Sequence, residues 1–250
     1  MTALVTGASG GLGSAIAGGL AHAGHAVAVH WRSDRAGTEA TAAAVRATGR
    51  VAHLVQRDLA VTEAAHLDHL GADLLDDATT ALGPLDVVVV NAWPQDVTAW
   101  ADLDTAAWDA MLNGGLRPAQ ALIAQAPERM THDGVIVTIG SIEGFRAASG
   151  HSSYAASKAA LHHLTAAAAY ELGPVGLRVV GVAPGLVDRP GLAQDWPDGH
   201  ARWCRASALG RPVTPEEVAA VVAFLASPAA GAVTGITVPV DAGWSASPGW

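Results

Sequence analysis

The sequence predicts an α/β fold in which a doubly wound, mainly parallel sheet of seven strands carries helices on both faces. Three observations lead to this fold class. Short apolar runs alternate with helical patterns almost from end to end, most of these runs are β-branched, and half of the 250 residues are hydrophobic while 15% are charged. Strands that are apolar on both faces are typical of a parallel sheet covered on both sides by helices. The alternation of strands and helices then favours the doubly wound arrangement.

The seven expected strands are short and apolar. They are Ala3–Thr6, Ala26–Trp31, Val51–Gln56, Asp86–Asn91, Gly134–Ile139, Leu177–Ala183 and Ile236–Val240. Right-handed crossovers between parallel strands place all their carboxyl ends at one edge of the sheet. We therefore expect the ligand site along that edge.

Alanine-rich stretches between the strands predict six helices, at about 12–23, 36–48, 62–82, 105–126, 152–172 and 215–226. The last begins at Thr214-Pro215-Glu216-Glu217, which supplies a capping residue, a first-turn proline and acidic residues. Gly24 and Gly49 follow two other helices, where a left-handed residue is favoured. The pair Gly83-Pro84 ends a third.

The segment from about 186 to 213 breaks this rhythm. It contains several prolines and tryptophans, namely Pro190, Trp196, Pro197, Trp203 and Pro212. A long irregular insertion at the ligand edge suggests a lid over the substrate. No internal repeat or linker is evident, so we interpret residues 1–250 as one domain that carries this lid.

Composition excludes several classes of protein. The net charge of −9 argues against nucleic acid as a partner, because phosphate binding needs clustered Lys and Arg. The single cysteine, Cys204, rules out an intrachain disulfide, fits a reducing compartment and is interpreted as a packing residue rather than a nucleophile. The N-terminus lacks the pattern of a signal peptide, and apolar runs such as Val87–Val90 are too short to cross a bilayer. We therefore expect a soluble cytoplasmic protein without a membrane partner.

A glycine-rich turn lies between the first expected strand and the first helix. It reads Thr6-Gly7-Ala8-Ser9-Gly10-Gly11-Leu12-Gly13, so the spacing is Gly7-x-x-x-Gly11-x-Gly13. Glycines let backbone N–H groups approach a pyrophosphate, and the N-terminus of the following helix favours that anion. Such a cluster can also be a plain strand–helix turn, but its position directly after the first strand favours dinucleotide binding.

A serine, a tyrosine and a lysine form a second pattern. Ser141 ends the fifth expected strand, and Tyr154 and Lys158 lie on the helix that follows. Residues four apart share one helix face, so the ammonium of Lys158 can lie near the phenol of Tyr154. A phenol with the ordinary pKa of about 10 is a poor acid or base at neutral pH until a neighbouring group lowers that pKa.

The T-G-x-x-x-G-x-G loop and the Tyr-x-x-x-Lys pair, with Ser141 and Asn113 in family order, resemble the short-chain dehydrogenase/reductase family over essentially the whole chain. The resemblance implies a Rossmann-type fold, a nicotinamide dinucleotide and an enzyme that interconverts a carbonyl and an alcohol. In the family's mechanism Ser141 would hydrogen-bond the substrate oxygen and Tyr154 would give or take the proton. Lys158 would lower the pKa of the phenol and hold the nicotinamide ribose.

Asn113 resembles the fourth catalytic residue of the family, which holds a water for proton relay. It lies in Met111-Leu112-Asn113-Gly114-Gly115, within an expected helix. Asn and glycine are locally costly in a helix, so a function is one explanation for their presence. A local helix kink without function is the alternative.

The end of the second strand, His30-Trp31-Arg32-Ser33, should decide which cofactor binds. An NAD enzyme usually has an Asp or Glu here that binds the ribose 2′-OH. In this chain Trp31 is aligned with it and Arg32 follows, whose planar guanidinium suits a phosphate. His30 and Ser33 could add donors, and Asp34 lies one turn too late for a ribose ligand. The prediction is NADP(H) rather than NAD(H), with a merely solvated Arg32 as the alternative.

The resemblance also implies which residues surround the cofactor. Asp58 would meet the adenine, Asn91-Ala92 would line the cofactor, and Pro184-Gly185 would touch the nicotinamide side. The full predicted cofactor-binding set is Gly7, Ser9, Gly11, Leu12, Gly13, Trp31, Arg32, Ser33, Asp58, Leu59, Asn91, Ala92, Tyr154, Lys158, Pro184, Gly185 and Val187.

Two segments depart from the family pattern. Val90-Asn91-Ala92-Trp93 stands where the family has Asn-Asn-Ala-Gly, and Trp93 either forms a wall of the substrate pocket or merely packs. Arg189 stands near the place of a threonine that binds the carboxamide in the family. It would contact an acidic substrate or pair with Asp188 or Asp195.

Paired histidines raise the question of a metal site, and tryptophans that of a substrate site. His66-x-x-His69 and His162-His163 have no cysteine or acidic partner that completes a zinc site, so no metal is predicted. Four tryptophans at expected edge segments suggest an aromatic or hydrophobic substrate, namely Trp93, Trp196, Trp203 and Trp244.

The resemblance implies a homotetramer, with a dimer second, built from the helices at 105–126 and 152–172 and the last strand with its C-terminal turn. Tyr170 is interpreted as a packing residue. Two other functions stay open: the same fold acting on C=C bonds or imines or in a non-redox step, and a non-catalytic dinucleotide-binding protein. The intact Ser-Tyr-Lys set argues against the latter.

Overall fold

The computed structural model describes residues 1–60 and 64–246, without the side chains of 64–68. Seven strands form one sheet in the order β3-β2-β1-β4-β5-β6-β7, and every adjacent pair is parallel. Their bounds are β1 Thr2–Val5, β2 Ala26–Trp31, β3 Ala52–Gln56, β4 Leu85–Val90, β5 Met130–Ile139, β6 Arg178–Pro184 and β7 Thr237–Val240. The predicted doubly wound α/β class is confirmed, with a sheet that is parallel throughout.

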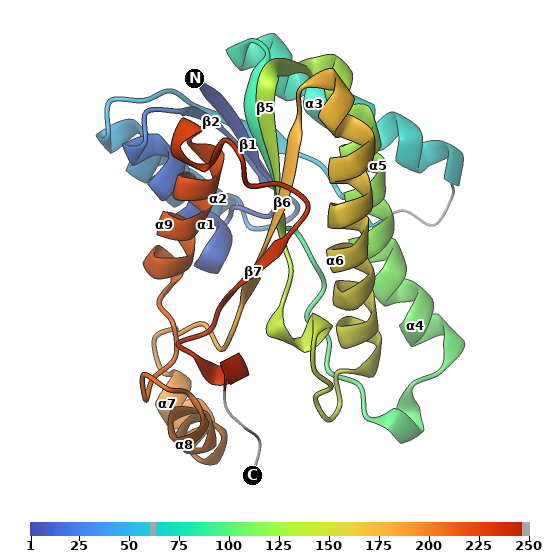
Figure 1. Ribbon diagram of the computed structural model, residues 1–250, viewed down its shortest axis with the longest axis vertical. Helices are drawn as coiled ribbons and strands as arrows, with labels where there is room; N and C mark the ends of the chain where they lie inside the picture. Colours follow the sequence, from blue (N-terminus) through green and yellow to red (C-terminus); the bar gives the residue numbers. More distant parts are fainter. Residues whose placement is uncertain (61–63, 247–250) are drawn as a thin grey trace.

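Two helical layers cover the sheet (Figure 1). One contains α1 Gly11–His22, α2 Arg35–Ala47 and α9 Pro215–Ala226, and the other contains α3 Ala64–Leu82, α5 Arg117–Gln125 and α6 Ser152–Leu172. Val87 and Val89 of β4 pack with the first layer, and Val88 and Val90 pack with the second. Because successive strand side chains alternate between faces, one apolar run supplies both hydrophobic cores.

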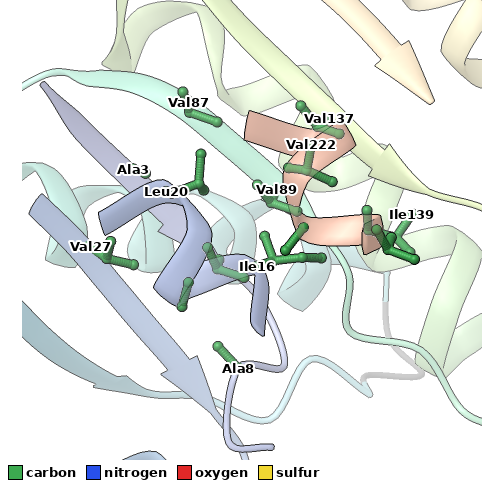
Figure 2. Packing of buried hydrophobic residues seen from close by; sticks show 14 of the residues in the cluster. Ala3, Ala8, Ile16, Leu20, Val27, Val87, Val89, Val137, Ile139 and Val222 are labelled. Atoms are coloured by element: carbon green, nitrogen blue, oxygen red, sulfur yellow. The ribbon is translucent and has the colours of Figure 1, made fainter. Parts of the chain in front are cut away.

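The core under α1 and α9 supports the start of the chain (Figure 2). Ile16 and Leu20 of α1 and Val222 of α9 are fully buried against sheet residues such as Val89. At about 1.5–3 kcal/mol for each large apolar side chain, this burial fixes α1 against the sheet. The glycine turn that joins β1 to α1 is therefore held at a fixed place on the carboxyl edge.

Three predicted elements differ from the observed ones. The helix expected at 105–126 is α4 Thr105–Met111 and α5, joined by a π-helical turn at Leu112–Leu116. The start of the helix expected at 62–82 lies partly outside the described residues, since 61–63 are not described and α3 begins at Ala64. The strand expected from Gly134 begins at Met130, because Met130 already pairs with Leu85 of β4 before a register shift, after which pairing resumes between Val87 and Val135.

The segment expected to be irregular is largely helical. It forms α7 Leu192–Asp195 and α8 Pro197–Ala206, which lie beyond the carboxyl edge of the sheet, at the bottom of Figure 1. Pro197 occupies the first turn of α8. A backbone N–H at this position has no partner within the helix, so the proline loses no hydrogen bond, and its fixed φ is already helical. Pro197 therefore begins a helix, whereas the sequence interpretation treated it as a sign of irregular chain.

Among the helices of the described residues, none is both long and apolar enough to cross a membrane.

Candidate active site

The carboxyl edge of the sheet brings Ser141 and Tyr154 together. Ser141 lies two residues after the end of β5 and is buried, and its Oγ accepts a hydrogen bond from the backbone N–H of Glu143 at 3.1 Å. Tyr154 lies in the first turn of α6, where a hydrogen bond with Ser141 favours the phenolate. The two residues that the sequence places thirteen positions apart are thus neighbours at one edge.

The pKa of Tyr154 is raised to about 12, which differs from the predicted lowering. Burial is the largest cause, because it penalises the phenolate, and the carboxylate of Glu143 also raises the pKa. The hydrogen bond with Ser141 opposes both effects without overcoming them. At neutral pH the phenol of this structure is therefore protonated.

Lys158 does not lower that pKa because its ammonium is directed elsewhere. Nζ donates a hydrogen bond to the carbonyl of Ile139 at 2.7 Å and lies 3.7 Å from the centroid of the Trp93 ring. It is 5.6 Å from the centroid of the Tyr154 ring. Burial lowers the pKa of Lys158 well below its ordinary value, while the carbonyl oxygen and the indole face both favour the charged form.

Trp93 packs beneath Lys158. Its Nε1 donates a hydrogen bond to Oγ of Ser157 at 3.2 Å, and that hydroxyl in turn donates to the carbonyl of Tyr154 at 2.7 Å. The indole also lies against Gly115, where a Cβ would stand 2.5 Å from a ring carbon. Of the two roles left open for Trp93, packing is the observed one, and the group it packs against is the lysine ammonium.

Asn113 lies in the π-helical turn between α4 and α5, which packs against α6. Its Oδ1 is buried and has no hydrogen-bond partner among the described residues. Gly114 and Gly115 leave room for Pro94 and Trp93, since a Cβ on Gly114 would stand 2.6 Å from the proline ring. The two glycines after Asn113 are thus explained by the bulky pair Trp93-Pro94, and single π-helical turns are frequent at functional sites.

The glycine turn is held from both neighbouring strands. The backbone N–H of Gly7 donates to Nδ1 of His30 at 3.0 Å, and that of Ala8 donates to the carbonyl of His30 at 2.8 Å. Nδ2 of Asn91 donates to the carbonyls of Thr6 at 2.8 Å and of Gly7 at 3.1 Å. Asn91 therefore supports the glycine turn itself. The resemblance had assigned Asn91 only to the lining of the cofactor site.

The same turn fits a dinucleotide diphosphate. α1 begins at Gly11, and its N-cap residue Gly10 makes no side-chain hydrogen bond, so the first N–H groups of the helix have no side-chain cap. A Cβ at Gly10 or Gly11 would meet nothing within 4 Å, whereas a Cβ at Gly13 would overlap the carbonyl of Gly7. The outer glycines thus border open space beside free donors, and the inner one allows the helix to pack closely. Ser9 and Leu12 belong to this same turn.

His30 does not face the cofactor side, which corrects one expectation. Its ring is buried, with Nδ1 bonded to Gly7 and Nε2 3.0 Å from the carbonyl of Arg57. Burial lowers the pKa of His30 to about 4, so the ring is neutral and supports the turn rather than contributing a donor to a phosphate. Trp31 is also buried, with 9% of its surface exposed.

Arg32 and Ser33 are exposed at the end of β2. Within the part of the chain that the structure describes, the guanidinium of Arg32 forms no ion pair. Asp34 caps α2 by accepting a hydrogen bond from the N–H of Gly37 at 2.9 Å, which agrees with its exclusion as a ribose ligand.

Residues predicted after the third and sixth strands also lie at the carboxyl edge. Asp58 is exposed and accepts from the N–H of Ala60 at 2.9 Å, and Leu59 is buried. Gly185 donates to the carbonyl of Val240 at 2.9 Å directly after Pro184 ends β6.

Val187 forms an isolated bridge with Val213, which joins the two ends of the 186–213 segment. Arg189 pairs with Asp195 through Nη1 and Oδ2 at 2.6 Å, one of the two ion pairs foreseen for it.

The four tryptophans do not form one cluster. Trp203 of α8 stacks on Trp244 with ring centroids 5.2 Å apart and planes 1° apart, and Trp203 also lies against Gly185. Trp196 is half-exposed and covers Gly199. Trp93 belongs to the lysine side of the site, so only two of the four meet.

Sequence reasoning missed two features beside the site. Nδ1 of His151 is within hydrogen-bond distance of Oε2 of Glu143, at 2.8 Å, and the His151 ring meets the Tyr154 ring edge-on with centroids 6.1 Å apart. Nε2 of His162, considered from sequence only as a metal ligand, is 3.4 Å from the backbone nitrogen of Ser141. Its spacing of four residues after Lys158 was the available signal. His66 lies among the residues whose side chains are not described.

Comparisons with known proteins match nearly the whole chain. Residues 7–245 match a family model described as enoyl-(acyl carrier protein) reductase. The chain is 36% identical over 247 residues to cis-4-hydroxycyclohexanecarboxylate dehydrogenase of Sinomonas cyclohexanicum, with 98% of this chain and 96% of that protein covered.

Two solved structures share the fold. A short-chain dehydrogenase/reductase from Serratia marcescens has a TM-score of 0.88 at 33% identity, with 98% of this chain and 97% of that chain covered. A short chain dehydrogenase from Burkholderia cenocepacia, in complex with NADP, has a TM-score of 0.87 at 32% identity, with 97% of each chain covered.

The fold and the site define an oxidoreductase that acts on CH–OH and C=O groups with a nicotinamide dinucleotide. More narrowly, the chain belongs to the short-chain dehydrogenase/reductase family.

Proposed function

We propose that this enzyme interconverts a carbonyl and an alcohol with NADP(H), using Ser141, Tyr154 and Lys158. One observation carries the proposal. The phenol of Tyr154, protonated at neutral pH, lies beside the hydroxyl of Ser141 at the carboxyl edge of the sheet, one helical turn from the buried Lys158. Proton transfer to a substrate oxygen needs such a positioned acid, and the bound nicotinamide supplies or accepts the hydride.

The raised pKa of Tyr154 keeps the phenol in the protonation state that carbonyl reduction requires. Since the phenol is protonated at neutral pH, it is ready to give its proton to an oxygen that becomes negative as a carbonyl is reduced. Ser141 supplies a second hydrogen bond to that oxygen. Asn113, with its unpartnered buried Oδ1 in the π-helical turn, is proposed to hold a water that returns a proton to the site.

The glycine turn and its neighbours hold the dinucleotide in this proposal. The uncapped N-terminus of α1 receives the diphosphate, and Lys158 holds the nicotinamide ribose. Asp58, Leu59, Asn91, Ala92, Pro184, Gly185 and Val187 line the remaining length.

Arg32 is proposed to select NADP(H) by binding the 2′-phosphate, with help from Ser33. Replacing Arg32 by Ala should weaken NADPH binding by about ten- to a hundredfold, because a charge-assisted contact is worth about 1.5–3 kcal/mol, and leave NADH binding nearly unchanged. Titration calorimetry with both dinucleotides measures this, with the exposed Arg35→Ala as the matched control. Equal loss for both dinucleotides would contradict the assignment.

Tyr154→Phe tests the acid. The variant should lose carbonyl reduction by at least about a hundredfold while it binds NADPH as the wild type does, since general acid catalysis contributes about 10²–10⁴-fold. NADPH oxidation at 340 nm and dinucleotide titration measure the two quantities. Tyr170→Phe, which changes the other tyrosine of the chain, should leave both at the wild-type value. Unchanged turnover in Tyr154→Phe would remove the proposed mechanism.

The proposed substrate is a hydrophobic or aromatic carbonyl compound bound under the segment 186–213, within a single domain of residues 1–250. Trp203 stacked on Trp244 beside Gly185 gives this segment an apolar wall on the side proposed for the nicotinamide. The relative from Sinomonas is named for a cyclic alcohol, which suits such a wall.

Reduction of a C=C bond is the second candidate, because the description of the matching family model names an enoyl reductase. A screen of NADPH oxidation with cyclic ketones, aryl ketones, enones and imines separates the two candidates. Activity confined to enones or imines would replace the carbonyl assignment.

A homotetramer is proposed as the assembly, with a dimer second. Large apolar side chains are exposed on the helices that the resemblance places at subunit interfaces, as with Tyr170 of α6 and Trp108 of α4. Exposed apolar groups of this size commonly mark association surfaces.

A further inference from the structure

We propose that His162 is a positioning residue for the serine of the active site: residues 140–145 fold around its ring, and its Nε2 holds the main chain of Ser141. The proposal rests on the proposed function, because it concerns the geometry of the Ser141–Tyr154 pair.

One face of α6 carries three functional side chains in sequence. Tyr154, Lys158 and His162 are spaced four residues apart, so they stack along the face that meets the end of β5. The backbone N–H of Ser141 donates to Nε2 of His162 at 3.4 Å. This bond joins Ser141, two residues after β5, to the middle of α6, next to the bond from Lys158 to Ile139.

The loop fits the ring on several sides. A Cβ on Gly140 would overlap Nε2 of His162, and a Cβ on Gly144 would overlap Cε1. Neither glycine has a positive φ, so the backbone conformation alone does not require glycine at these positions. The ring of Phe145 lies against the imidazole, with centroids 4.3 Å apart. The imidazole of His162 therefore fills the space that side chains at positions 140 and 144 would occupy, so the loop and the ring are complementary in shape.

The bond to Ser141 also sets the tautomer of the ring. Burial, together with the charge of Lys158, lowers the pKa of His162 to about 4, so the imidazole is neutral. Because Nε2 accepts from Ser141, the proton is on Nδ1. Nδ1 is buried and has no partner among the described residues. An unpaired buried donor costs free energy, so an apolar side chain would suit stability better, and its retention points to a task other than stability.

The loop carries the hydroxyl of Ser141, and the position of this hydroxyl indicates the task of His162. Oγ of Ser141 accepts from the N–H of Glu143 in the same turn and bonds the phenol of Tyr154. A rotation of the turn around an absent ring would move this hydroxyl away from the phenol and from the substrate oxygen. Displacements of about 1 Å at a reacting centre can cost on the order of a hundredfold in rate.

The test compares His162→Gln with His162→Met. The two replacements have similar length and volume, but only glutamine offers a good acceptor near the place of Nε2. His163→Met is the matched control, since His163 is exposed on the next position of the same helix. We expect kcat to fall on the order of 10- to 100-fold in His162→Met, with KM and NADPH affinity changed little, and to recover within severalfold in His162→Gln.

A second readout does not depend on activity. The chain has two tyrosines, so ¹³Cζ-tyrosine labelling gives two NMR signals, and Tyr170→Phe identifies that of Tyr154. The Ser141→Ala variant gives the position of this signal without the serine hydrogen bond. His162→Met should move the signal most of the way to that position, whereas His162→Gln and His163→Met should leave it near the wild-type position.

Several outcomes would overturn the proposal. A Tyr154 signal at the wild-type position in His162→Met would do so, and so would equal kinetic losses in the Gln and Met variants that follow their stability. If His162→Met does not fold, Gly144→Ala replaces it, because the added methyl displaces the ring from the loop; an unmoved signal would then contradict the proposal. A wild-type enzyme without carbonyl turnover would refute the proposed function alone, since the NMR comparison still reports on His162.

Discussion

At the residue scale, the site differs from the sequence prediction in its electrostatics. Tyr154 and Lys158 share a helix face as the spacing predicts, yet the pKa of the phenol is raised to about 12. The ammonium is held 3.7 Å from the Trp93 ring and bonds the carbonyl of Ile139. A spacing of four residues therefore places two side chains near each other. Trp93, after β4, and Ile139 of β5 decide where the ammonium of Lys158 points.

This electrostatic arrangement predicts opposite pH profiles for the two directions of the reaction. Because the raised pKa of Tyr154 keeps the phenol protonated well above neutral pH, ketone reduction at saturating substrate should show no loss from its ionisation between about pH 7 and 10. Alcohol oxidation needs the phenolate, whose fraction rises about tenfold for each pH unit below the pKa, so its rate should climb through the same range.

Measurement of kcat in both directions across this range checks the prediction. Tyr170→Phe serves as the control, since an exposed tyrosine should not affect either profile. An oxidation rate that levels off near pH 7–8 would mean that the bound complex lowers the pKa of Tyr154 below its ordinary value, as the family resemblance implied.

At the element scale, the π-helical turn at Leu112–Leu116 is the clearest departure from a regular pattern. The sequence predicts one helix through this region, and propensity alone gives no reason for two consecutive glycines in it. In the structure they face Trp93 and Pro94, which enter from the loop after β4. Trp93-Pro94 after β4 and Gly114-Gly115 in the helical region thus form one contact, in which the small pair leaves room for the bulky pair.

The contact between Gly115 and Trp93 can be tested by a double-mutant cycle. Gly115→Ala should lower the free energy of unfolding by about 1–3 kcal/mol, because the new methyl overlaps the indole and the overlap exceeds the gain in helix propensity. In a Trp93→Phe background, whose smaller ring vacates that space, the same change should cost less. Urea unfolding of the four proteins gives the coupling energy.

Gly18→Ala, in the middle of α1, is the control for helix propensity, since a Cβ there would meet nothing within 4 Å. Equal costs of Gly115→Ala in both backgrounds would show that the two residues do not interact, and the explanation of the glycine pair would be wrong.

At the scale of the whole molecule, two hydrophobic cores position the site, and exposed apolar groups point outward for assembly. Tyr170 is 85% exposed and Trp100 is 78% exposed. The sequence interpretation of Tyr170 as a packing residue is therefore wrong within the isolated chain. A second copy of this chain is the partner that we propose for these side chains.

The tetramer proposal makes a simple prediction. Light scattering after size-exclusion chromatography should give four times the chain mass, and Tyr170→Lys should shift the population towards dimer or monomer, because an ammonium in an apolar interface is costly to desolvate. His163→Lys, an added charge at another exposed position of α6, indicates whether charge anywhere on the helix has this effect. A wild-type protein that stays monomeric at all concentrations would contradict the proposal.

The fold followed from the sequence because its determinants are local and repeated. Strands with apolar residues on both faces alternate with helices, and a glycine turn follows the first strand, so order and type of nearly every element could be predicted. The bounds of α6 and α9 agree with the prediction at both ends. The α9 start also shows the expected cap, in which Thr214 and Glu217 bond each other's backbone N–H groups.

Local patterns thus determined the sheet and the glycine turn, and the family resemblance supplied the predicted set Ser141, Tyr154 and Lys158. Contacts between distant segments decided the rest: the role of Trp93, the break in the helix at Leu112–Leu116, the use of His30 inside the turn and the place of His162 behind the serine. The physical reason is that periodicity reports which face of an element is buried. What a buried polar or aromatic group meets depends on neighbours that only the folded chain brings within a few ångströms.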